Sequence, residues 1–132
     1  MNVVTWLSLM CFLPAALPQQ APWGRDNVPV SARDRVYAAD QTSNTVSVID
    51  PSSNKLLGVI RLGDPVPDAL SPLYTRQLLV HGLGYSPDSR TLAVVSVGSN
   101  SVTLIDTITK KVKRTVYVGR SPHEAFLYAG WT

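Results

Sequence analysis

One pattern occurs twice in the sequence, and this internal repeat limits the possible folds more than any other feature. Residues 43–63 read SNTVSVIDPSSNKLLGVIRLG, and residues 99–119 read SNSVTLIDTITKKVKRTVYVG. Val102 corresponds to Val46, an offset of 56 that we call the long offset. Each copy has two apolar, β-branched runs separated by a polar tract of turn-forming residues, which is typical of a β-hairpin. Repeats with periods of tens of residues are typical of stacked folds such as solenoids and propellers.

A second pair of matching segments has a shorter spacing. His81 in VHGLGYSPDS corresponds to His123 in PHEAFLYAGW, an offset of 42 that we call the short offset. Propeller blades of four strands recur about every 40–45 residues, so the short offset fits one blade. The long offset exceeds the short offset by 14. The sequence therefore predicts an enlarged connection between Gly63 and His81.

The predicted strands form one incomplete set and one complete set. Apolar residues occur on both faces of these strands, which indicates sheets that are covered on both sides. The expected fold class is all-β: an incomplete β-propeller of about two blades, with three and four antiparallel strands, after an apolar N-terminal segment. The expected strands are residues 35–40, 45–50 and 55–62, then 82–86, 91–98, 101–106 and 112–118, with a further strand near 125–128.

The repeated segments resemble a known family. RVYAADQTSNTVSVID (35–50) and HGLGYSPDSRTLAVVSVGSNSVTLIDTITKKVKRTVYVGRSPH (81–123) are similar to the YVTN-type β-propeller repeat family of secreted and surface proteins, through the SNxVxxID step, the paired glycines Gly63 and Gly119, and the SPD and SPH tripeptides. The resemblance covers about residues 35–127. It implies a propeller whose first blade receives its missing innermost strand from the far end of the chain. It implies no particular activity, because such blades occur in binding proteins and in enzymes.

The chain divides into an apolar leader, a linker and the repeat region. Residues 3–17 are almost entirely apolar but too few to span a membrane comfortably, which favours a signal peptide at 1–23 and a secreted, periplasmic or cell-surface location. An uncleaved N-terminal anchor and a start codon assigned too far upstream are the alternatives. The expected divisions are a linker at 24–34 and a partial propeller at 35–132, made of blade 1 (35–63), an inserted loop (64–80), blade 2 (81–119) and the start of blade 3 (120–132). This organisation resembles the N-terminal piece of a longer propeller.

Composition excludes few functions. The 132 residues suit one small domain, and a net charge of +3 does not indicate nucleic-acid binding. The single cysteine, Cys11, allows no disulfide within the chain. The one basic cluster is interpreted as a charged outer strand that prevents edge-to-edge aggregation, with a nucleic-acid or acidic-glycan site as the alternative. This cluster consists of Lys110, Lys111, Lys113 and Arg114.

Two features indicate where a ligand would bind. Long loops inside compact repeats tend to be functional, and in propellers the connection from an outer strand to the next inner strand lies at the mouth of the channel. The alternatives are a loop that covers the sheet edge with its own apolar side chains, and histidines that bond the adjacent blade. The candidate binding residues are Tyr74, Arg76, His81, Arg120 and His123.

No motif for catalysis, phosphate binding or metal binding occurs in the sequence. The two histidines have no further histidine or acidic cluster to complete a metal site. Asp50 and Asp106 are interpreted as turn-formers rather than catalytic acids. The sequence therefore favours a binding or interaction scaffold with no chemistry or cofactor of its own, for a protein or small-molecule ligand. The alternative is a fragment of a propeller enzyme, such as a lactonase or a cofactor-dependent oxidoreductase.

Two blades leave apolar faces and a strand edge uncovered. Repeat proteins generally need about three units to bury their faces, and an open strand edge invites pairing with another chain. We therefore expect residues 24–132, expressed alone, to be oligomeric, aggregated or only partly folded.

Overall fold

The computed structural model describes residues 29–64 and 77–129. Within these residues every regular element is a strand, and no helix is present that could cross a membrane. The strands are β1 (Val36–Asp40), β2 (Thr45–Asp50), β3 (Lys55–Arg61), β4 (Val80–Tyr85), β5 (Thr91–Ser96), β6 (Ser101–Asp106) and β7 (Val112–Tyr117).

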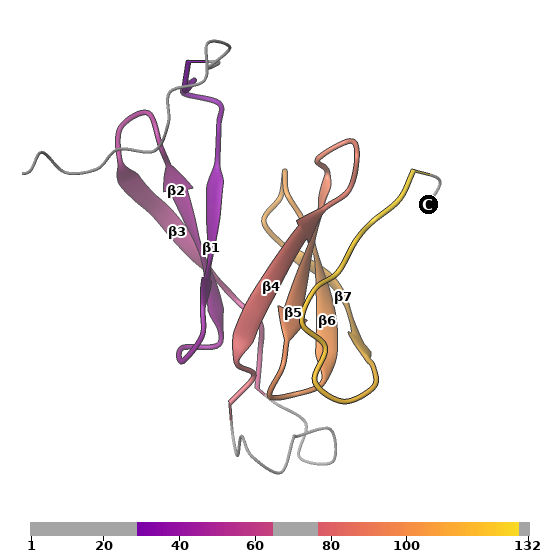
Figure 1. The fold of residues 1–132 in the computed structure, drawn as a ribbon. Helices are drawn as coiled ribbons and strands as arrows, with labels where there is room; N and C mark the ends of the chain where they lie inside the picture. Colours follow the sequence, from indigo (N-terminus) through magenta and orange to yellow (C-terminus); the bar gives the residue numbers. More distant parts are fainter. Residues whose placement is uncertain (1–28, 65–76, 130–132) are drawn as a thin grey trace, which may run out of the picture.

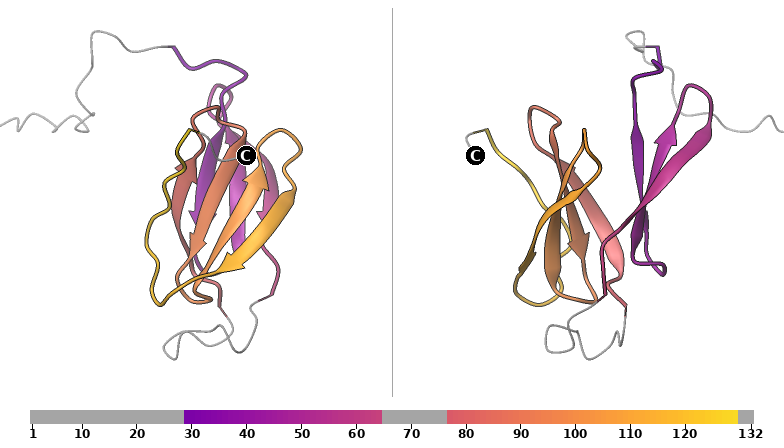
Figure 2. Two further views of the ribbon diagram at one scale, coloured as in Figure 1. Left: turned by 90° about the vertical axis from the view of Figure 1, so that its right-hand side faces the viewer. Right: turned by 180° about the vertical axis from the view of Figure 1, so that it is seen from behind.

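The strands form two antiparallel sheets in which neighbours in sequence are neighbours in space. The first sheet has the order β1-β2-β3 and the second has the order β4-β5-β6-β7. The sheets stand face to face, with β1 beside β4 (Figures 1 and 2). The prediction of an all-β chain with sheets of three and four strands is confirmed. The sequence predicted a strand that begins at Gly82, directly after His81. In the structure β4 begins at Val80, so His81 lies inside the strand.

Both repeat offsets recur in the backbone. Asn44 and Asn100, which are related by the long offset, have φ angles of 57° and 52°. Leu79 and Ser121, which are related by the short offset, have φ angles of 49° and 53°. Each asparagine also bonds the chain that leads into the next inner segment, since Asn44 Oδ1 accepts from the backbone N–H of Leu78 at 2.8 Å and Asn100 Oδ1 from that of Ser121 at 3.0 Å. The sequence repeat is therefore also a repeat of local structure.

The core lies between the two sheets. Successive side chains of a strand point to opposite faces, so Val46 and Val48 of β2 both face the second sheet, where Leu92 and Val94 of β5 face them. Fully burying such a side chain stabilises the fold by about 1.5–3 kcal/mol. Leu78 and Leu79, at the end of the enlarged connection, are buried too. The rest of this connection, residues 65–76, lies outside the described residues, so the interpretation of a loop that covers the sheet edge stays a prediction.

The faces turned away from this core are partly open. Val36 and Val59 lie on the outer face of the first sheet, because their neighbours Tyr37 and Ile60 face the core, and they are 45% and 50% exposed. Val116, opposite Val102 on the outer face of the second sheet, is 39% exposed. These positions are the uncovered apolar surface that a two-blade arrangement was expected to leave.

The strand predicted near residues 125–128 is not formed. This segment runs along the second sheet beside β4 (Figure 2). A Cβ atom built on Gly82 would overlap the carbonyl oxygen of His123, and one on Gly84 would overlap that of Ala125. Because the side-chain positions of β4 point at the segment, it lies against the face of the sheet and not at its edge. Strands pair edge to edge through their backbone groups, so no ladder forms here.

Candidate functional site

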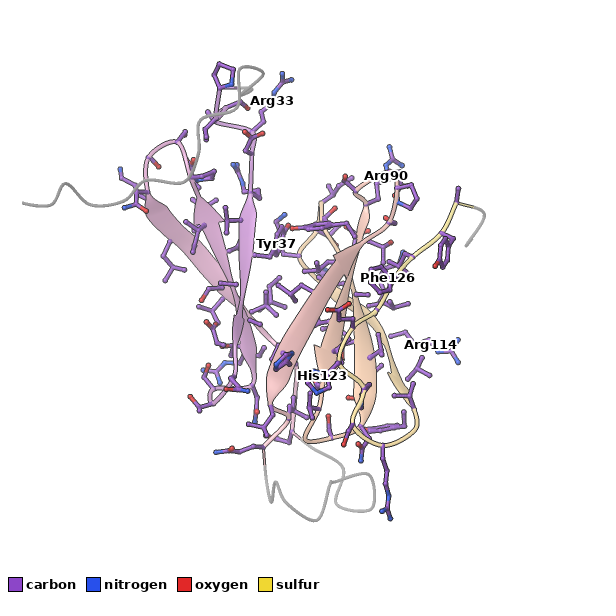
Figure 3. The ribbon with its side chains drawn as sticks, viewed as in Figure 1. Arg33, Tyr37, Arg90, Arg114, His123 and Phe126 are labelled. Atoms are coloured by element: carbon purple, nitrogen blue, oxygen red, sulfur yellow. The ribbon has the colours of Figure 1, made fainter. Side chains whose placement is uncertain are left out.

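The two repeated histidines meet at one end of the sheets. The ring centroids of His81 and His123 are 4.8 Å apart, and the ring planes are inclined by 73°. Each histidine follows by two positions a residue with positive φ, Leu79 in one case and Ser121 in the other. The chain therefore enters both segments through the same turn, and the close approach of the second segment to Gly82 brings the two imidazoles side by side. Figure 3 shows His123 beside β4.

A hollow of about 350 Å³ surrounds this pair. It combines two imidazoles and two carboxamides with aliphatic walls, and both polar groups can donate and accept hydrogen bonds. We call it the histidine hollow. Its lining residues are Gln41, Gln77, Leu79, His81, Val97 and His123.

The structure brings together two of the five predicted site residues. His81 and His123 line the hollow, whereas Arg120 is exposed and is not part of its lining. Tyr74 and Arg76 lie outside the described residues. Sequence reasoning missed Gln41 and Gln77. The repeat held a signal for Gln41. The long offset equates Gln41 with Val97, and both residues lie in turns at the end of the sheets that carries the histidines.

The histidine hollow is built for hydrogen bonding. Across residues 29–64 and 77–129 there is no group of three or more His, Cys, Asp or Glu side chains that could hold a metal ion. Two imidazoles supply two ligands, whereas zinc sites use at least three protein ligands.

A second, larger hollow lies between the sheets near Tyr37, at the opposite end (Figure 3). It measures about 570 Å³, and Tyr37 and Tyr85 pack edge to face in its wall with ring centroids 5.9 Å apart. Burial, with a smaller contribution from Tyr37, raises the pKa of Tyr85 to about 12, so its hydroxyl stays protonated and can donate a hydrogen bond. We call it the tyrosine cleft. Its lining residues are Arg33, Asp34, Arg35, Tyr37, Tyr85, Ser89, Thr107 and Lys110.

Lys110 does not share the role that was predicted for the basic cluster. Its ammonium lies 5.0 Å from the centre of the Tyr37 ring and donates to the Tyr37 hydroxyl and the Thr107 carbonyl. A cation over an aromatic face is attracted by the ring, so Lys110 joins the two sheets. The residues of β7 are exposed along the edge of the second sheet, as the edge-strand interpretation requires.

The aspartates after β2 and β6 organise turns. Asp50 accepts from the backbone N–H of Ser52 at 2.8 Å and from the hydroxyls of Ser52 and Ser53 at 2.6 and 2.9 Å. Asp106 accepts from the backbone N–H groups of Ile108 and Thr109 at 2.9 and 2.8 Å. Hydrogen bonds to a carboxylate favour its charged form. The Ser52 hydroxyl, followed by that of Ser53, lowers the pKa of Asp50 from 3.8 to about 2.

Acidification should weaken the fold through this turn. A carboxyl whose pKa is lower in the folded state stabilises the fold above its unfolded pKa, and this contribution is lost as the pH falls towards the folded pKa. For Asp50 the loss falls between about pH 4 and pH 2. We expect Asp50→Asn to flatten the fall in urea midpoint over this range, because asparagine cannot be protonated there. An unchanged slope in the variant would contradict this assignment.

Comparison with solved structures finds a partial similarity of fold. Hydrazine synthase from Kuenenia stuttgartiensis matches with a TM-score of 0.56 and 18% sequence identity, over 70% of this chain and 22% of that chain. At this identity the similarity concerns the fold alone, because one fold hosts many functions. Searches with protein-family models and among curated proteins find no match.

Proposed function

We propose that this chain is part of an exported, non-catalytic β-propeller of the repeat type, which binds a ligand at the histidine hollow. The observation that carries the proposal is the meeting of His81 and His123, two residues related by the repeat, beside two carboxamides. The two meandering sheets and their matching turns support the propeller interpretation. Export to the periplasm, the cell surface or the medium is the part of the proposal that rests on the apolar leader.

The chemistry of the hollow selects a polar ligand. Imidazole nitrogens and carboxamides form hydrogen bonds, which suits hydroxyl, amide or carboxyl groups on a small molecule or a protein loop. A volume of about 350 Å³ lies in the range of small-molecule sites, roughly 300–1,000 Å³.

The serine hydroxyls do not support acyl transfer. Ser99 bonds to Ser101 at 2.8 Å, and Ser43 bonds to Thr45 at 2.7 Å. A serine nucleophile needs a base within hydrogen-bond reach, and no serine in the described residues is bonded to either imidazole. These contacts favour binding over catalysis as the function.

Ligand-observed NMR with a panel of small sugars, amides and carboxylic acids would test this proposal. We expect some of these fragments to bind the wild-type chain and to bind the His81→Ala/His123→Ala variant at least tenfold more weakly. Arg120→Ala is the matched control, because Arg120 lies three residues before His123 but does not line the hollow. Equal binding to both chains would overturn the assignment. Lactone hydrolysis that disappears in the double variant would instead favour the enzyme alternative.

A further inference from the structure

In the described residues the first sheet has three strands, one fewer than the second sheet. By the long offset, β1 corresponds to residues 92–96 of β5. β5 is paired on both sides, with β4 and with β6, whereas β1 is paired with β2 alone among the described strands. Among the described residues, nothing therefore takes the place of β4 beside β1, and this edge of β1 has no strand partner there.

The C-terminal segment corresponds by the repeat to an inner strand, but it forms no strand in the structure. By the short offset, residues 122–127 correspond to β4 (Val80–Tyr85). The segment enters through the same positive-φ turn as β4, yet it has no strand partner among the described residues. Phe126, near its end, is 72% exposed. Within residues 29–64 and 77–129, one sheet thus has no inner strand, and one segment equivalent to an inner strand has no sheet.

We propose that a second copy of this chain supplies the missing strand. Residues 122–127 of one copy pair antiparallel with β1 of the next copy, so that the copies join head to tail. The proposal concerns assembly and does not depend on which ligand the histidine hollow takes.

The repeat fixes the register of this pairing. In the second sheet Leu83 of β4 lies opposite Val94 of β5, and Gly84 lies opposite Ala93. The short offset equates Leu83 with Ala125, and the long offset equates Val94 with Ala38. In the proposed pairing, Ala125 of one copy therefore lies opposite Ala38 of the next. The same shift places Phe126 opposite Tyr37.

This register gives the exposed Phe126 a partner. Tyr37 lines the tyrosine cleft, where its ring already packs against Tyr85. Aromatic side chains on directly opposite residues of an antiparallel pair are within contact distance and stabilise it. The pairing would therefore extend an existing aromatic contact at the open edge of β1.

The outer faces also match. Within one chain, Val46 and Val48 of the first sheet pack on Leu92 and Val94 of the second. By the long offset, Val46 and Val48 are equivalent to Val102 and Leu104, which lie on the outer face of the second sheet. Leu92 and Val94 are equivalent to Val36 and Ala38, which lie on the outer face of the first sheet. The junction between copies therefore repeats an interface that the chain already forms within itself.

The same junction would extend the ligand site. Val97 lies beside His81 in the wall of the histidine hollow. The residue equivalent to Val97 in the first sheet is Gln41, so Gln41 of the second copy would lie beside His123. Each junction would then repeat the hollow, with one wall from each copy.

The strand count limits the size of the assembly. The described part of each copy has three strands, four strands and one unpaired inner segment, which together make two blades of four. Closed propellers have about four to eight blades, and a head-to-tail contact forms a ring when its rotation closes. We therefore expect rings of about two to four copies.

Cysteine cross-linking in mixtures would test the register. In a Cys11→Ser background, a chain with Ala38→Cys is mixed with a chain carrying Ala125→Cys and oxidised. Directly opposite residues of an antiparallel pair have Cα atoms about 4.5–5.5 Å apart, within disulfide reach. We expect a covalent dimer on a non-reducing gel, at least tenfold more abundant than in the control mixture of Ala38→Cys with Glu124→Cys, because Glu124 is exposed and is the neighbour of Ala125. A slip of one residue turns the side chain to the other face, so the control pair should not bridge.

Sedimentation of the unmodified 132-residue chain gives an independent readout that does not depend on any substitution. The expected result is a species of two to four copies whose population falls on dilution. A monomer at all micromolar concentrations, or equal cross-linking in the two mixtures, would overturn the proposal. Fragment binding at His81 is measured separately, so failure of the ligand site and failure of the assembly can be told apart.

Discussion

Replacing Asn44 with alanine should destabilise the fold by about 2–5 kcal/mol, because two separate contributions are lost. Asn44 has a φ of 57°, and the left-handed conformation costs most residues about 1–2 kcal/mol. Its side chain also accepts the partly buried backbone N–H of Leu78 at 2.8 Å. A buried donor without an acceptor costs about 1–3 kcal/mol. Urea unfolding of the variant, compared with the wild type, measures the sum.

Two further variants separate these contributions. Asn44→Gly keeps the left-handed backbone at little cost and removes only the bond to Leu78. Asn54→Ala changes a residue with a φ of 52° in an exposed turn, where the side chain makes no hydrogen bond within the described residues. It should therefore cost only about 1–2 kcal/mol. If Asn44→Ala destabilised the chain no more than Asn54→Ala does, the bond from Leu78 to Asn44 would have no structural importance.

The strands were predictable because their signals are local. The boundaries of β2 and β6 match the prediction, since each strand is a short β-branched run between turn-forming residues. Asp50 and Asp106 bond to residues only two or three positions away, so their role as turn-formers could also be derived from the sequence. The repeat doubled the evidence, because each hairpin supports the interpretation of the other.

Contacts between the sheets could not be predicted in the same way. Lys110 was grouped with its basic neighbours, but its φ of 61° turns the chain there, and its side chain reaches Tyr37, far earlier in the sequence. The C-terminal segment was predicted as a strand because the repeat equates it with β4, whereas its position against the face of β4 follows from the placement of the two segments in space. Periodicity along the chain encodes which face a residue occupies, but it does not encode what covers that face.

The candidate site illustrates the same limit. The repeat indicated that His81 and His123 are equivalent, but equivalence does not require contact. Their meeting depends on the close approach of the C-terminal segment to Gly82, where no side chain intervenes. Gln41 and Gln77 come from two other loops, and their residue type gave no signal.

Replacing Gly82 with alanine should release the C-terminal segment from the second sheet. A Cβ atom at this position would overlap the carbonyl oxygen of His123, a backbone atom that cannot move away alone. Overpacking of this kind costs about 1–3 kcal/mol. We expect lower stability in urea, faster chymotryptic cleavage after Phe126, and loss of the ring contact between His81 and His123 in NMR spectra. The sheets themselves should persist, because their hydrogen bonds and core do not involve this segment.

Gly58→Ala is the matched control for this last substitution. Gly58 lies in β3, and a Cβ atom there would meet nothing within 4 Å. Alanine at a compatible glycine position restricts the unfolded chain and stabilises a protein by about 0.4–1 kcal/mol. The two alanine variants should therefore change stability in opposite directions. If Gly82→Ala were as stable as Gly58→Ala and cleaved no faster, the segment would not pack on β4, and the histidine hollow would lose one of its two imidazoles.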